Sequence, residues 1–346
     1  MRKYLFLILC VAVILPASGA IRWLEKDFDF GTFKELGGPK TGVSRFVNLG
    51  PDTISILNVK PSCGCTSVDY TRSLILPGDT ARISYTYDPS FRPGKFEKSV
   101  RVTLSGGIHQ IIRIRGNVIG TPESLASLYP IEAGQMRLTD HVAPFGETVM
   151  GHSPVAFINA YVISPDTIVP ALVSENKALT VSPSVAKAGP GDVVTFTLSL
   201  DTKAAGLYGP AEFPLHADGL MTEVKATAVI LPDATTLKIQ QQGKSPVLEI
   251  SDDLLELGSV GSSPQSAEFI IKNEGKGPLD ILGIYTTTEA IKITEAPKSV
   301  KPGKSAKVKA VLDPEYLSPG AQRQKIEILT NDPARTRAVV NVALIK

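Results

Sequence analysis

One sequence unit recurs three times along this chain of 346 residues, and that repetition limits its possible folds more than any other feature. A proline–glycine pair recurs at steps of 113 and 112 residues, and an aspartate follows each glycine by 10 residues. The pairs are Pro77-Gly78, Pro190-Gly191 and Pro302-Gly303, and the aspartates are Asp88, Asp201 and Asp313. This spacing indicates tandem copies of one domain.

Between each glycine and its aspartate, apolar residues alternate with mostly polar ones. The apolar sets are Ala81, Ile83, Tyr85 and Tyr87, then Val194, Phe196, Leu198 and Leu200, then Ala306, Val308, Ala310 and Leu312. A period of two residues predicts a half-buried strand. Because a slip of one residue would turn the apolar set to solvent, the shared register predicts the same strand in all three copies.

The other landmarks of each copy also predict short strands and turns. Each copy opens with an apolar residue and a glycine (Phe30-Gly31, Phe145-Gly146, Leu257-Gly258), and its next strand ends near Asn48, Asn159 or Asn273. The 29 glycines and 26 prolines exceed the usual share and favour many tight turns. No segment has the period of an amphipathic helix. This combination is typical of a β-sandwich.

The sequence therefore predicts an all-β chain of three tandem immunoglobulin-like β-sandwich domains after a signal peptide. We place the domains at 21–120, 121–235 and 236–346, with the second the most divergent. A repeat of 112 residues suits a seven-stranded sandwich of about 100 residues. The extra sequence at 124–140 predicts an interdomain contact or an additional strand.

Residues 1–20 have the order of a secretory signal peptide. A basic start is followed by an apolar run to Pro16 and small residues from Ala17 to Ala20. Cleavage after Gly19 and cleavage after Ala20 both fit this pattern. The alternative is an uncleaved membrane anchor, but the apolar run is shorter than the roughly 20 residues that a membrane-spanning helix needs. Cys10 follows Leu9, which argues against lipidation there. We expect a periplasmic or cell-envelope protein, with membrane contact only through an uncleaved signal segment.

Charge and motifs argue against several functions. Beyond residue 20 the chain has 34 basic and 34 acidic residues, so nothing favours nucleic acid as a partner. The strings Gly243-Lys244-Ser245 and Gly303-Lys304-Ser305 lack the glycine that a phosphate loop has five residues earlier. The four histidines are scattered singly, and no small-molecule substrate is evident. We therefore expect a protein that is not an enzyme and has no cofactor.

The chemically interesting residues are Cys63 and Cys65, separated by Gly64. On a regular strand their Cα atoms would lie about 6.6 Å apart, at the upper end of disulfide reach. Gly64 lets the chain bend and bring the sulfurs closer. So small a ring adds little stability through chain entropy, and its strain favours reduction.

Four interpretations of this pair stay open. Cys63 and Cys65 could form a passive disulfide, remain two packed thiols without a role, act as a redox-active or partner-linking dithiol, or bind a soft metal. Copper(I) is the first metal to consider because two thiolates can hold it. Zinc needs about two more ligands, of which His109 is a conceivable one.

The first copy resembles a known bacterial family, the domain of unknown function 1573. The motifs that carry the resemblance are Phe28-Asp29-Phe30-Gly31, Phe46-Val47-Asn48-Leu49-Gly50, Pro61-Ser62-Cys63-Gly64-Cys65-Thr66, Leu76-Pro77-Gly78-Asp79 and Tyr87-Asp88-Pro89-Ser90. That secreted family is marked by Cys-Gly-Cys-Thr and is related to immunoglobulin-like domains of the Hydin and major-sperm-protein type. The third copy keeps Leu257-Gly258 and Asn273-Glu274-Gly275 without cysteines. The resemblance implies the fold and an envelope location but no reaction.

Repeat architecture without catalytic motifs predicts a structural or protein-binding scaffold of the cell envelope. Its partner would be an envelope protein not identified by the sequence, and pairing with an edge strand is one mode of binding. The alternative is a copper-binding or thiol-redox protein that uses Cys63 and Cys65.

Overall fold

The computed structural model describes residues 21–346, so the predicted signal peptide at 1–20 lies outside the described residues. The described chain divides into two compact units. One holds residues 21–128 with Tyr161–Asp166 and Gly189–Val193, and the other holds Tyr129–Ala160, Thr167–Ala188 and Val194–Lys346. Within residues 21–346, no helix is long and apolar enough to span a membrane.

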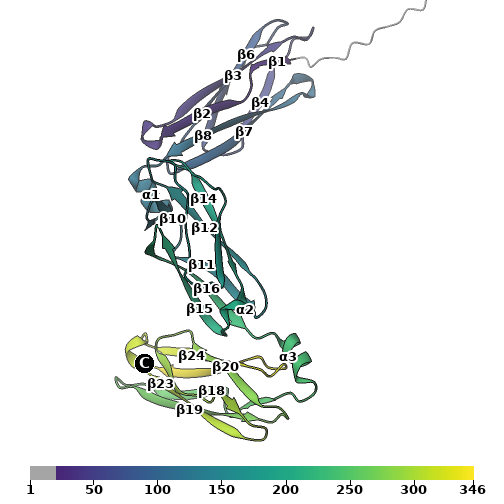
Figure 1. The fold of residues 1–346 in the computed structure, drawn as a ribbon. Helices are drawn as coiled ribbons and strands as arrows, with labels where there is room; N and C mark the ends of the chain where they lie inside the picture. Colours follow the sequence, from purple (N-terminus) through teal and green to yellow (C-terminus); the bar gives the residue numbers. More distant parts are fainter. Residues whose placement is uncertain (1–20) are drawn as a thin grey trace, which may run out of the picture. The chain divides into compact units, whose positions relative to one another are not determined.

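Residues 21–119 form two four-stranded sheets that pack face to face (Figure 1). The first sheet holds β1 (Ile21–Glu25), β3 (Lys40–Asn48), β5 (Thr66–Tyr70) and β6 (Thr80–Tyr87), in the order β1-β3-β6-β5. The second holds β2 (Phe28–Lys34), β4 (Ile56–Pro61), β7 (Gly94–Leu104) and β8 (His109–Ile119), in the order β2-β8-β7-β4. Ile83 and Tyr85 of one sheet meet Val100 and Ile112 of the other in a fully buried core. This arrangement is a β-sandwich.

A second pair of sheets follows between residues 131 and 231. One sheet holds β9 (Ile131–Ala133), β10 (Met136–Leu138), β12 (Val155–Val162), β13 (Leu179–Pro183) and β14 (Val193–Leu200), in the order β13-β14-β12-β10-β9. The other holds β11 (Val142–Val149), β15 (Gly209–Ala217) and β16 (Leu220–Leu231), in the order β11-β16-β15. The extra sequence at 124–140 thus supplies the strands β9 and β10.

The third pair of sheets lies between residues 248 and 345. One sheet holds β17 (Leu248–Ile250), β19 (Gln265–Asn273), β21 (Ile291–Glu295) and β23 (Ser305–Leu312), in the order β17-β19-β23-β21. The other holds β18 (Leu254–Ser259), β20 (Leu279–Thr286), β22 (Ser299–Val300), β24 (Ala321–Thr330) and β25 (Arg337–Ile345), in the order β18-β25-β24-β20-β22. The all-β fold class is confirmed, and the domain boundaries at 120 and 235 stay a prediction.

The three alternating segments are the strands β6, β14 and β23, and each lies inside its sheet between two neighbours. Eleven of their twelve predicted apolar residues are buried, and Ala306 is partly buried. The aspartate after each strand fixes the turn that follows, as Asp88 does when its carboxylate accepts a hydrogen bond from the Ser90 amide at 3.0 Å. Asp201 and Asp313 likewise accept from the amides of Lys203 and Glu315.

The opening apolar-glycine pair marks an irregularity in a parallel strand pair in each copy. β2 pairs with β8, β11 with β16 and β18 with β25, and each pairing shifts register beside the glycine. Gly31, Gly146 and Gly258 have φ of 65°, 71° and 65° there, a conformation that favours glycine.

Asn48 and Asn273 connect the loops at one end of the first and third sheet pairs. The Asn48 side chain is fully buried and donates to the carbonyls of Asp52 (2.8 Å) and Ile75 (3.1 Å). The Asn273 side chain makes the equivalent bonds to Gly277 and Val300. In the second pair the predicted position, Asn159, was wrong: β12 continues to Val162, whose backbone bonds to Gly191 and Asp192 match those of Asn48 to Gly78 and Asp79.

The described residues also form three short helices, which the absence of an amphipathic period did not predict. The structure has α1 (Pro122–Leu128), α2 (Thr202–Ala205) and α3 (Ala234–Gln241), besides the 3-10 turns η1 (Glu35–Gly37), η2 (Ser105–Gly107) and η3 (Pro314–Tyr316). None of the residues of α3 is buried, and α1 and α2 are two turns or less. Such helices have no apolar stripe for a sequence pattern to reveal.

The Glu35 carboxylate holds the chain that leaves the first sheet pair. It is 9% exposed and accepts hydrogen bonds from the Phe91 amide (2.7 Å), the Thr121 amide (3.0 Å) and the Ser124 hydroxyl (2.6 Å). Burial alone would raise the pKa of Glu35, but these hydrogen bonds outweigh it and hold the pKa below its ordinary value. The start of α1 is thereby fixed to η1.

We predict that Asn48→Ala lowers the free energy of unfolding by about 2–3 kcal/mol, because it removes the buried side chain whose hydrogen bonds to the Asp52 and Ile75 carbonyls join two loops. The measurement is urea denaturation. Asn58→Ala, at an exposed position of β4, is the control and is expected to change stability by less than about 0.5 kcal/mol. Equal effects of the two substitutions would contradict a structural role for Asn48.

We predict that Glu35 makes stability depend on acid pH. Because its pKa is lower in the folded chain than its ordinary value of 4.5, its contribution is complete above pH 4.5 and is lost as the pH falls through the folded pKa. Thermal unfolding from pH 7 to pH 3 should therefore show a smaller acid-induced loss of stability in Glu35→Gln than in wild type. Glu123→Gln, at an exposed site on α1, should retain the wild-type slope.

Candidate functional site

Cys63 and Cys65 lie in the turn that connects β4 with β5, the point where the chain crosses from one sheet to the other. Their Cα atoms are 5.3 Å apart and their sulfurs are at bonding distance, 1.93 Å. The turn thus shortens the spacing of about 6.6 Å that a regular strand would impose. Both β4 and β5 are edge strands.

The two sulfurs differ in their access to solvent. Cys65 is 7% exposed, whereas Cys63 is only partly buried. The Thr66 hydroxyl, on a side chain that is 3% exposed, lies 3.7 Å from Cys63 Sγ and 3.8 Å from Cys65 Sγ. One fixed hydroxyl therefore contacts both sulfurs.

An aromatic cluster packs against the buried side of the turn. Cys65 packs with the buried residues Tyr87 and Val118, and the rings of Tyr87 and Phe96 are stacked at a centroid distance of 3.8 Å. Burial raises the pKa of Tyr87, which the nearby Arg92 partly offsets. The sulfurs thus rest on a rigid apolar base.

The open side of the turn faces a basic groove. The groove has a volume of about 380 Å³. Its lining side chains include the two cysteines, Tyr87, Phe96 and the three cations Arg92, Lys95 and Lys98. Arg92 lies 4.0 Å from the Asp88 carboxylate, and Lys95 pairs with Asp192 at 3.0 Å. Positive charge next to a cysteine lowers the pKa of its thiol.

His109 is not part of this site. It begins β8 and pairs with Thr103, whereas Val118 at the other end of β8 lies under the sulfurs. Nine residues of strand separate the two positions, about 30 Å. In the part of the chain that the structure describes, no three His, Cys, Asp or Glu side chains gather to hold a metal ion. A metal role for Cys63 and Cys65 stays a prediction.

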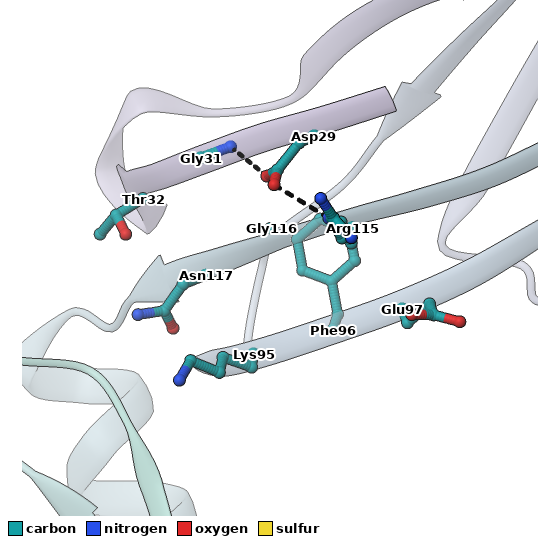
Figure 2. A pocket seen from close by; sticks show the side chains of 9 residues that line it. All are labelled: Asp29, Gly31, Thr32, Lys95, Phe96, Glu97, Arg115, Gly116 and Asn117. Atoms are coloured by element: carbon teal, nitrogen blue, oxygen red, sulfur yellow. Dashed lines mark hydrogen bonds and ion pairs between the residues drawn. The ribbon is translucent and has the colours of Figure 1, made fainter. Parts of the chain in front are cut away.

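A second groove, of about 470 Å³, adjoins the first through Lys95 and Phe96. Figure 2 shows the Asp29 carboxylate between the Gly31 amide and Arg115, which donate to it at 2.8 and 2.9 Å. The Gly31 amide and Arg115 lower the pKa of Asp29. Both hydrogen bonds of the Asp29 carboxylate stabilise the irregular part of β2. Asp29 therefore has a structural role in this groove.

Sequence reasoning found the cysteines but not their surroundings. Thr66 follows the motif directly and could have been recognised as a neighbour. Arg92, Lys95 and Lys98 lie more than 25 residues further along the chain, so no local spacing connects them with the sulfurs.

Comparison with solved structures gives distant likenesses. A protein of unknown function from Porphyromonas gingivalis W83 is 18% identical, with a TM-score of 0.48 over 62% of this chain and 100% of that one. A PapD-like domain of human CEP192 is 14% identical, with a TM-score of 0.26 over 35% of this chain and 99% of that one. The secreted serine protease VesC from Vibrio cholerae is 11% identical, with a TM-score of 0.28 over 54% and 47%. Likenesses of this degree say nothing about activity.

The sequence matches none of the curated proteins. The family model described as "Protein of unknown function (DUF1573)" matches residues 21–118 and 248–343. These segments contain the first and third sheet pairs and together make up more than half of the chain. Because the family model covers more than half of its length, the chain belongs to the DUF1573 family.

Proposed function

We propose that this chain is a non-enzymatic scaffold of the cell envelope that binds a partner protein through one end of its first sheet pair. The observation that carries the proposal is a set of three exposed leucines, Leu49, Leu74 and Leu76, which we call the leucine end. They lie on the loops 49–55 and 71–79 and are 56%, 68% and 54% exposed.

The two loops of the leucine end are held together. Asn48 bonds to a carbonyl in each loop, and Ile54 and Ile75 exchange backbone hydrogen bonds of 3.0 and 2.8 Å. The leucines are therefore presented on a fixed support, which reduces the entropy lost when a partner binds.

The third sheet pair shows that the fold does not require these leucines. Asn48 matches Asn273 at an offset of 225 residues, and the same offset relates Leu49 to Glu274 and Leu76 to Lys301. The connecting bonds of the two asparagines are equivalent. Since the third sheet pair has charged residues at the positions that match Leu49 and Leu76, these exposed leucines indicate a role other than folding.

A protein partner fits this surface best. Single exposed leucines are ordinary, but several on two joined loops are typical of a protein-binding site. Apolar contacts dominate the centre of protein interfaces. Export is inferred from the pattern of residues 1–20, which places the partner in the periplasm or envelope.

Copper binding by Cys63 and Cys65 is less favoured. The two sulfurs are bonded to each other, so neither is a free thiolate, and a two-electron reduction would have to come first. Arg92, Lys95 and Lys98 line the same groove and would repel a cation.

The test exchanges the leucines for the matching residues of the third sheet pair. A photo-crosslinking amino acid is placed at position 74 in the cells that make the protein. We expect a discrete cross-linked product. The double substitution Leu49→Glu with Leu76→Lys should reduce its amount by about tenfold or more, since burying two leucine side chains against the partner contributes over about 1.4 kcal/mol to binding. The melting temperature should stay unchanged, because both side chains are exposed.

Ile111→Glu is the control, because Ile111 is 45% exposed on β8 outside the leucine end. It should leave the product intact. An undiminished product in the double variant would overturn the proposal. So would a product that consists of two copies of this chain, or binding to lipid vesicles that the double variant abolishes.

A further inference from the structure

The turn of Cys63 and Cys65 forms in the other two sheet pairs without sulfur. In all three, the amide of the repeated aspartate donates to the residue at the Cys65 position: Asp88 to Cys65, Asp201 to Ala178 and Asp313 to Ala290, at 2.9, 2.8 and 2.8 Å. Ala178 and Ala290 are buried like Cys65. A small buried side chain is thus all that the fold requires at this position.

Backbone hydrogen bonds also hold the turn on both sides. The Ser62 amide donates to the Ser99 carbonyl at 2.8 Å before the cysteines, and the Asp88 amide binds the Cys65 carbonyl after them. Both bonds are independent of the sulfurs. The S–S bond can therefore open and close while β4 and β5 keep their places.

The surroundings distinguish the two sulfurs chemically. Both cysteines line the basic groove, but Cys63 is the more exposed, so an incoming thiolate can reach it, whereas Cys65 is 7% exposed and packs with Tyr87 and Val118. When the bond breaks, the Thr66 hydroxyl, within 3.8 Å of either sulfur, can donate to the thiolate that forms. A hydrogen bond to the charged form favours that form.

The charges that face the groove act in the same direction. Arg92, Lys95 and Lys98 line it, and the carboxylates nearest to them are Asp88 beside Arg92 and Asp192 beside Lys95. Of the described residues, no carboxylate lines the groove. Apart from the three cations and the two cysteines, Tyr87 is the only titratable residue among the described ones that line it. The net positive charge stabilises thiolates and attracts an anionic sulfur nucleophile.

We propose that Cys63 and Cys65 are a thiol–disulfide exchange site, reduced by the dithiol of a partner protein. The partner's thiolate attacks Cys63 Sγ, the Cys63–Cys65 bond breaks, and Cys65 leaves as a thiolate beside Thr66. The partner's second thiolate then attacks its own bonded sulfur and releases Cys63. Two electrons pass to the pair, the partner becomes a disulfide, and the two thiolates take protons from water.

The experiment reduces the folded full chain with dithiothreitol or with reduced thioredoxin as a protein dithiol. Iodoacetamide then labels the free thiols, and tandem mass spectrometry of the tryptic peptide 46–72 locates the label. We expect both reagents to open the bond without loss of the folded circular dichroism spectrum. With limiting iodoacetamide, Cys63 should react about tenfold faster than Cys65, in keeping with its greater exposure.

Variants separate a working site from a passive disulfide. Thr66→Val should lower the labelling rate of the reduced pair at pH 7 by about tenfold and shift its pH profile upward by about one pKa unit. Lys98→Gln should lower the rate about threefold, the effect of one nearby charge. Thr103→Val and Lys60→Gln are the matched controls, since neither side chain lines the groove, and both should behave as wild type.

Three results would overturn the proposal. One is that the Cys63–Cys65 bond resists both reductants until the chain unfolds. Another is that iodoacetamide labels Cys65 before Cys63. Reduction by dithiothreitol but not by thioredoxin would exclude a protein dithiol. None of these results bears on the leucine end, whose test uses a different surface.

Discussion

Burial of one alternating strand inside each sheet pair is the constraint on which the rest of the structure depends. β6, β14 and β23 turn every second side chain toward the facing sheet, so each can occupy a single register. The positive-φ glycines before them and the aspartates after them fix both ends of each strand. The two sites that we propose lie at the loops and turns that this register positions.

The copies differ at a buried position as well as at exposed ones. Asn48 and Asn273 bond to the loops around them, but Val162 takes that place in the second sheet pair with the same backbone bonds. Leu49 stands where the third pair has Glu274. A repeated fold therefore supplies its own comparison: an exposed apolar residue that another copy replaces by a charged one, as Leu49 is by Glu274, is not required by the shared fold.

The cysteine turn follows the same logic at the opposite end of the first sheet pair. Alanines fill the Cys65 position in the other copies, so the sulfur chemistry is an addition to a turn that is stable without it. The aromatic base of Tyr87 and Phe96 and the groove cations come from β6, β7 and the loop between them. The exchange site that we propose and the leucine end thus lie at opposite ends of β4 and β5.

The sequence alone determined the period of the repeat, the register of β6, β14 and β23, the turn residues and the cysteine motif, because these depend on local alternation and spacing. It did not reveal α1 and α3, which bury little or nothing, and it misplaced the end of β12 at Asn159. Only the tertiary structure decided which sulfur is exposed, which cations face it and that His109 lies far away. Those relations join residues distant in the chain, and sheet pairing rather than sequence spacing brings them together.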